Sequence, residues 1–175
     1  IAEVEKITGK KYEYSDSKKD IAFRVLADHI RAISFAIADG QLPSNNKAGY
    51  VIRRILRRAV RYAYSFLNFR EPVLCSMVPV LCKSFEGQFP ELDSQQDFIA
   101  RVIQEEEHSF LKTLETGIKR FEQYEGKTID GQFAFELFDT FGFPIDLTRL
   151  IASENNFAID EEGFDAEMQQ QKNRS

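Results

Sequence analysis

The side chains best suited to chemistry in this chain are arginines gathered on one predicted helix. Between Gln41 and Arg70 there are seven basic residues and no acidic one, although the whole chain has a net charge of −5, so the other residues together carry −12. Five of the seven are Arg53, Arg54, Arg57, Arg58 and Arg61. At about 100° per residue they fall within an arc of roughly 140° on a helix. Because a guanidinium matches a phosphate with paired hydrogen bonds, this arc predicts an anionic partner.

Three interpretations of the arginine face are open on the residues alone. Guanidinium groups that share a helix face without a carboxylate repel one another. Phosphates of a nucleic acid could neutralise them, and this is the preferred interpretation. Glutamates from elsewhere in the fold could also do so, with Glu105–Glu107 as the candidate run. A membrane surface is the third, but it requires the apolar face of the helix to be available, whereas that face needs a packing partner.

Two further residues, Asn45 and Asp139, are candidates for reading a base. Asn45 lies in the turn QLPSNNKAG before the arginine helix, and its side chain offers both a donor and an acceptor. Its alternative role is that of a turn or cap residue. Asp139 falls near the end of a predicted helix, where a carboxylate opposes the helix dipole, and a following FGFP turn could hold it at the surface. Its alternative role is to close its own turn.

Catalytic and metal-binding patterns are missing from the sequence. His29 and His108 are the only histidines, and neither has a cysteine or carboxylate at metal-ligand spacing. Cys75 and Cys82 are interpreted as buried, reduced thiols, the alternative being a disulfide or a metal pair. The run Glu105–Glu107 has too exposed a pattern for an acid–base pair. We therefore expect no catalysis from this chain itself.

The elements that must position these residues are helices, and the predicted fold class is all-α. Sustained two-residue alternation is absent, so we expect an irregular multi-helix bundle with one long helix and one amphipathic, arginine-rich helix. No apolar run reaches the roughly 18 residues of a membrane span, and no secretory signal opens the chain. The first residue is Ile and the last stretch is polar and glutamine-rich, from which we expect a piece of a longer protein.

Helix limits follow from caps and breakers. The expected helices in the first half are one closed by Gly9, a long apolar one from an Asp20 cap to Gly40, the arginine helix from about Tyr50 to Leu67, and a buried one within Pro72–Phe89 in which Pro79 makes a bend or marks a break. In the second half we expect one of about 30 residues from a Ser94 cap to Tyr124, a phenylalanine-rich one capped by Asp130, and a last one capped by Asp146.

Three separated strings resemble the alanyl-tRNA synthetase family, class II enzymes that attach alanine to its tRNA. They are RVLADHIRAISFAIADGQLPSNNKAGYVIRRILRRAVRYA, EEEHSFLKTLETGIKRFE and LFDTFGFPIDLT, and the resemblance runs from about Gly9 to Met168. It implies one helical recognition domain over residues 1–175 for the tRNA-Ala acceptor stem, in a cytoplasmic enzyme. It places ATP and Mg²⁺ in a catalytic domain, and zinc in an editing domain, both outside this chain. No cofactor or metal and no membrane contact are therefore expected here, but an intramolecular contact with the catalytic domain is.

The resemblance also assigns residues. The Asn of the family's PSN turn matches Asn45, and the Asp of its YDT motif matches Asp139; these two read a G·U wobble pair in the acceptor stem. The family's basic helix matches Arg53–Arg61, which would hold the RNA backbone. Departures are Asn46-Lys47-Ala48, where a glycine often precedes the final Gly-Tyr, and Phe138 in place of tyrosine. The alternative function is a helical scaffold or protein-interaction domain whose arginines pair internally.

Overall fold

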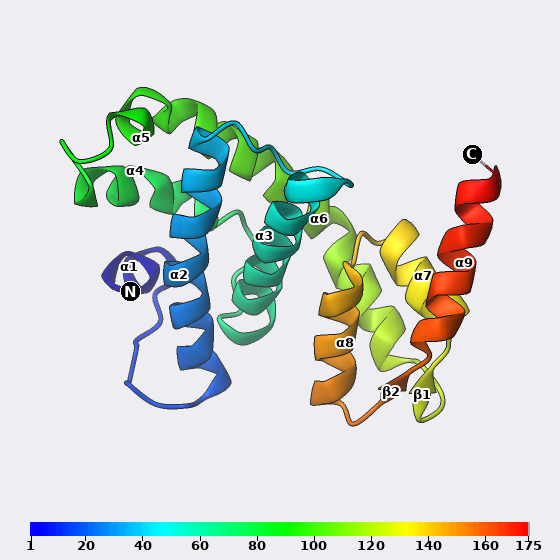
Figure 1. Ribbon diagram of the computed structural model, residues 1–175. Coiled ribbons are helices and arrows are strands. Elements are labelled where there is room, and N and C mark those ends of the chain that lie inside the picture. Colours follow the sequence, from blue (N-terminus) through cyan, green and yellow to red (C-terminus); the bar gives the residue numbers. More distant parts are fainter. Residues whose placement is uncertain (175) are drawn as a thin grey trace. The chain divides into compact units, whose positions relative to one another are not determined.

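The computed structural model describes residues 1–174, which form two compact units, one from Ile1 to Leu111 and the other from Lys112 onward. Helices dominate both units, and two strands of two residues each complete the described part (Figure 1). The predicted all-α class is therefore confirmed, with a small strand pair that periodicity could not indicate. Among residues 1–174 no helix combines the length and the apolar character that crossing a membrane demands. The grouping of residues 1–175 into one recognition domain stays a prediction.

Unit 1 is built around two long helices that pack against each other, α2 and α3 (Figure 1). The helices of this unit are α1 (Ala2–Thr8), α2 (Lys18–Ala38), α3 (Lys47–Phe66), α4 (Leu74–Ser84), α5 (Pro90–Ser94) and the first part of α6 (Gln96–Glu122). The inward face of α2 is buried at Phe23, Leu26, Ile30, Ile33 and Ile37, which recur at three- and four-residue spacing. This apolar stripe makes α2 the helix on which α3 and α4 pack.

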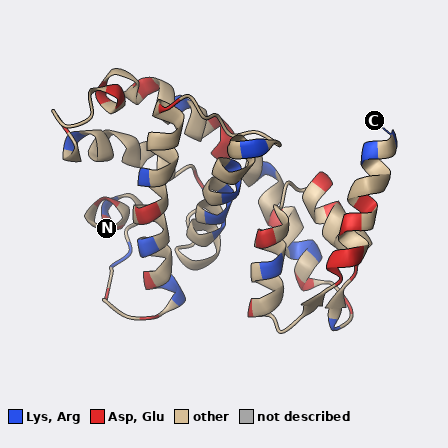
Figure 2. Cartoon of the chain, in the orientation of Figure 1, with Lys and Arg blue, Asp and Glu red and all other residues tan. Residues whose placement is uncertain are grey.

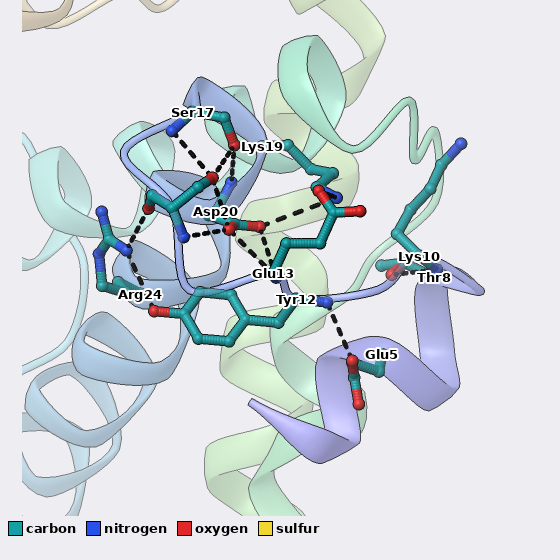
Figure 3. Close-up of polar contacts among 10 residues, drawn as sticks. Glu5, Thr8, Lys10, Tyr12, Glu13, Ser17, Lys19, Asp20 and Arg24 are labelled. Carbon is teal, nitrogen blue, oxygen red and sulfur yellow. Dashed lines mark hydrogen bonds and ion pairs between the residues drawn. The ribbon is translucent and has the colours of Figure 1, made fainter.

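The start of α2 differs from the prediction, because Ser17 caps the helix and Asp20 does not. The Ser17 hydroxyl accepts a hydrogen bond from the Asp20 backbone N–H at 3.2 Å. Asp20 is fully buried, and its carboxylate accepts from the backbone N–H groups of Glu13 and Ser15 and from the Ser15 hydroxyl (Figure 3). A hydroxyl three residues before the acidic residue outcompetes it as the cap. The carboxylate then ties the preceding loop to the helix.

Two other helix starts in the structure also differ from the prediction. Ser94 ends the short helix α5 and does not cap a long one, since Pro90 at the first helical position begins a separate turn. Asp146 lies inside the first turn of α8, whose cap is Pro144. Pro79 lies within α4 and does not break it, and Gly9 and Asp130 end and begin their helices as predicted.

The acidic run Glu105–Glu107 is less exposed than its pattern indicated. Glu107 is fully buried and Glu106 nearly so, while Glu105 is exposed. The Glu107 carboxylate accepts from the backbone N–H groups of Val73, Leu74 and Cys75 at 2.8, 3.0 and 2.9 Å. Helix α4 has no side-chain cap of its own, so a residue of α6 satisfies its first donors. The prediction of an exposed run was wrong because an acidic triplet can meet a helix N-terminus that is distant in sequence.

Unit 2 contains the rest of α6 and a small helical layer with a parallel strand pair. Its elements are β1 (Thr128–Ile129), α7 (Gly131–Asp139), α8 (Ile145–Glu154), β2 (Ala158–Ile159) and α9 (Glu161–Arg174), with Thr128 opposite Ala158 and Ile129 opposite Ile159. Helices α7 and α9 come close because two glycines meet: a Cβ on Gly131 would lie 2.2 Å from the carbonyl carbon of Gly163. Helix α9 escaped prediction, since Phe164 is its one buried residue and it lacks an apolar stripe.

Candidate nucleic-acid interface

Helix α3 has the two faces that its sequence predicts. Its buried apolar residues are Ile52, Leu56, Ala59, Val60, Tyr62 and Ala63, while Ile55 is half-buried. Basic residues recur along the helix, and no acidic residue occurs in it (Figure 2). The apolar face packs against α2, so it is not available to a membrane surface.

Arg53 and Arg57 form ion pairs with Glu106 inside the fold. Arg53 donates from Nε and Nη2 to the two carboxylate oxygens of Glu106 at 2.8 and 3.2 Å. Arg57 donates from Nε to Glu106 Oε1 at 2.9 Å, and its Nη2 lies 2.8 Å from the same oxygen. Side-chain exposure is 20% for Arg53, 12% for Arg57 and 10% for Glu106. Burial lowers the pKa of Arg57, and the Glu106 carboxylate acts in the opposite direction. For these two residues the internal-pairing interpretation holds.

The other three arginines differ in exposure. Arg61 is buried, and its guanidinium carbon lies 4.8 Å from the centre of the Phe66 ring. Arg54 is half-buried, and its guanidinium carbon lies 5.9 Å from the centre of the Tyr50 ring. Arg58 is exposed, with its guanidinium 5.9 Å from the Tyr62 ring. Of the predicted backbone-binding arginines, Arg58 is therefore the most accessible to a phosphate.

Asn45 lies exposed in the turn that leads into α3. The helix cap is its neighbour Asn46, so Asn45 itself does not cap the helix. A backbone hydrogen bond from Ser44 N–H to the Gly49 carbonyl closes the turn at 3.0 Å. Close approach requires glycine there, because a Cβ on Gly49 would lie 2.3 Å from the Leu42 carbonyl oxygen. The side-chain oxygen Oδ1 of Asn45 accepts a hydrogen bond from Nη1 of Arg53.

Asp139 is the last residue of α7 in unit 2 and its side chain is exposed. Its Oδ1 accepts a hydrogen bond from Nε2 of Gln171 at 2.8 Å, so α9 holds the carboxylate. The following turn is anchored on α6, where the Thr113 hydroxyl donates to the Phe141 carbonyl at 2.7 Å. Phe143 is fully buried, at a point where a Cβ on Gly117 would lie 2.6 Å from its ring. These contacts hold the end of α7 firmly while leaving Asp139 at the surface.

The structure thus joins Asn45 to Arg53, Glu106 and Arg57 in unit 1, and Asp139 to Gln171 in unit 2. Sequence reasoning named the acidic run as a possible neutraliser of the arginines but did not identify Glu106. Gln171 was missed altogether, because a polar helix without an apolar stripe gives no periodic signal.

Neither cysteine is bonded to the other, as predicted, but only Cys82 is buried, whereas Cys75 is half-buried. Burial, followed by the charge of Glu107, raises the pKa of Cys75 to about 11. Within residues 1–174 no group of three histidine, cysteine or acidic side chains is arranged to hold a metal ion. That no metal or cofactor belongs to this chain stays a prediction.

Comparison with known proteins gives one consistent result. The family model described as tRNA synthetases class II (A) matches residues 1–175. An alanine–tRNA ligase of Cytophaga hutchinsonii is 63% identical over 98% of this chain, and one of Porphyromonas gingivalis is 60% identical over 91%. One of Christiangramia forsetii is 56% identical over the whole chain. The chain spans about a fifth of the length of these relatives.

Proposed function

Since this chain belongs to the class II tRNA synthetases (A), as its resemblance to alanyl-tRNA synthetases predicted, we propose that it recognises the acceptor stem of the alanine tRNA. In this proposal the parent enzyme is a cytoplasmic alanine–tRNA ligase that attaches alanine using ATP and Mg²⁺, bound in a catalytic domain that this chain contacts. The observation that carries the proposal is that two exposed polar side chains, Asn45 and Asp139, each accept a hydrogen bond from another side chain of the fold.

The base pair that these two residues read is a G·U wobble pair. In A-form RNA the minor groove is wide and shallow, so side chains reach base edges there. A G·U pair leaves the guanine 2-amino group unpaired in this groove. The Asp139 carboxylate can only accept hydrogen bonds and suits that amino group, while the Asn45 carboxamide can donate to an acceptor of the base pair. A G·C pair uses the amino group internally and offers a poorer match.

Affinity without base choice comes from phosphate contacts. Arg58 is the arginine of α3 whose exposure suits this role best. Arg53 and Arg57 already have Glu106 as a partner, so their contribution to phosphate binding is smaller than their position on the helix suggests.

The test is binding of the full 175-residue chain to an acceptor-stem hairpin of the alanine tRNA and to its G·C-substituted twin, at about 50 and 200 mM salt. Tighter binding of the G·U hairpin, weakening as salt rises, is the expected result. Equal binding of the two hairpins contradicts base reading by this chain. If the chain does not bind either hairpin at the lower salt concentration although its circular dichroism shows folded helices, the proposal is contradicted. That result favours the scaffold with internally paired arginines.

A further inference from the structure

Glu106 is a carboxylate with an unusual position. It projects from α6 toward α3, is 9% exposed as a residue, and contacts both Arg53 and Arg57. A carboxylate removed from water is costly unless it is paired and hydrogen-bonded, and two guanidinium groups supply that compensation. The cluster is thus a fixed point in unit 1, close to the surface turn that carries Asn45.

The geometry of Arg53 carries this fixed point to Asn45. A guanidinium is planar and rigid, so the directions of its N–H bonds are not independent. Nε and Nη2 of Arg53 are held by the two oxygens of Glu106. That double contact sets the direction of Nη1, which donates to Oδ1 of Asn45. The Asn45 carboxamide oxygen therefore faces Arg53, and its Nδ2 amide group is left to face away.

We propose that Arg53 and Glu106 are positioning residues that orient the Asn45 carboxamide for base reading. The inference rests on the proposed function, in which Asn45 contacts the base pair. An exposed asparagine on a turn would otherwise sample several rotamers and present either its oxygen or its amide group. Holding it in one orientation before RNA arrives lowers the entropy that recognition costs and selects against a pair that needs the opposite orientation.

A phosphate-binding role for Arg53 makes different predictions. If Arg53 served as a backbone contact, removing Glu106 would release positive charge and tighten binding of every stem alike. If Glu106 were only structural, its loss would lower activity on all stems in proportion. A positioning role alone changes the ratio between G·U and G·C substrates. The readout is therefore this ratio, not the activity on one substrate.

The experiment is charging of G·U and G·C tRNA by the intact ligase that contains this chain, with kcat/KM determined for both. Glu106→Gln keeps the shape and removes the charge that fixes Arg53, and Arg53→Gln removes the guanidinium. We expect each to reduce the G·U to G·C ratio about five- to tenfold, within the range that one base contact provides. Arg53→Lys keeps the charge but loses the planar fork, so it does not restore the ratio. Glu105→Gln, an exposed neighbour, is the control and leaves the ratio unchanged.

Asn45→Ala separates this inference from the proposed function. If Asn45→Ala lowers the ratio while Arg53→Gln and Glu106→Gln leave it within twofold of the parent value, the positioning role is overturned and base reading by Asn45 stands. An unchanged ratio in Asn45→Ala overturns both. When both roles hold, the double variant with Asn45→Ala and Glu106→Gln has the same G·U to G·C ratio as Asn45→Ala alone, because both substitutions remove one contact. Should Glu106→Gln fail to fold, as judged by circular dichroism, Arg53→Gln decides the question.

Discussion

At the residue scale, the two exposed polar side chains proposed to read the base pair are each held by another side chain. Arg53 holds Asn45, and Gln171 holds Asp139 at 2.8 Å. Both supports leave the supported residue at the surface. Polar groups that are exposed and yet oriented are suited to recognition, because little conformational entropy is lost when they bind.

The first prediction concerns Asp139. Asp139→Asn keeps the shape of the side chain but places an amide group where the guanine amino group must be accepted. We expect kcat/KM for the G·U tRNA to fall roughly 5- to 150-fold, which corresponds to a loss of about 1–3 kcal/mol of transition-state stabilisation. Charging assays with the intact ligase measure this effect. Asn46→Ala is the matched control, since Asn46 makes no side-chain cap bond, and it should charge normally. Normal charging by Asp139→Asn would remove Asp139 from the recognition site.

At the element scale, buried carboxylates hold a helix start and a loop in place. Glu107 of α6 binds the first N–H groups of α4, and Asp20 of α2 binds the loop before its own helix. Both carboxylates are fully buried. Each satisfies several backbone donors at once, which is why neither position tolerates an apolar side chain without cost.

The prediction for α4 uses two neighbouring glutamates. Glu107→Ala leaves buried N–H groups at the start of α4 without an acceptor, and each such donor costs about 1–3 kcal/mol. We expect the free energy of unfolding, measured by urea denaturation, to drop by at least that amount. Glu105→Ala, two residues away and exposed, should change it by less than about 0.5 kcal/mol. Equal values for the two variants would show that α4 does not depend on Glu107.

The buried Asp20 carboxylate makes the stability of the fold depend on pH in the acidic range. Burial by itself raises the pKa of Asp20, but hydrogen bonds from Ser15 and Glu13 outweigh it, and the folded-state pKa lies below the ordinary value. A lowered pKa means that the carboxylate stabilises the fold above the unfolded-state pKa, about 3.9, and that this stabilisation is lost as pH falls through the folded-state pKa. We expect Asp20→Asn to be less stable than the parent chain at pH 6 and to show a smaller further loss between pH 4 and pH 2. Thermal unfolding across this range tests it; parallel curves for the two proteins would contradict it.

At the scale of the whole molecule, charge is segregated. The chain has a net charge of −5, while Gln41–Arg70 carries seven basic residues and no acidic one. Glu106 is the nearest counter-charge and is shared by Arg53 and Arg57. In the proposed function, the surface that would attract RNA is therefore narrower than the count of arginines suggests, and the negative charge of the remaining surface would repel RNA.

This segregation predicts which arginine controls salt dependence. Arg58→Gln should weaken binding of the G·U and G·C hairpins alike and reduce the slope of log K against log salt by about one ion. Arg57→Gln should change the slope less, because Arg57 is already paired, and should destabilise the fold by leaving Glu106 with one partner fewer. Titrations at several salt concentrations measure both slopes. A larger change for Arg57→Gln than for Arg58→Gln would reverse this assignment.

The sequence by itself determined the features that depend on residues a few positions apart. The helical class, the apolar face of α3, and the helix limits at Gly9 and Asp130 follow from periodicity and capping, which act within one or two turns. The resemblance also predicts that Asn45 and Asp139 read a base pair, and this role stays a prediction. The predicted helix limits were wrong where two possible capping residues lie close together, as Ser17 and Asp20 do.

Only the tertiary structure decided which charged groups meet. Glu106 reaches Arg53 across 53 positions, Glu107 reaches Val73 across 34, and Gln171 reaches Asp139 across 32. A five-arginine face looks uniform in sequence, yet packing buries Arg61, pairs Arg53 and Arg57, and exposes Arg58. The physical reason is that the free energy of a charge is set by its exposure to water and by its nearest counter-charge, and both depend on how helices pack.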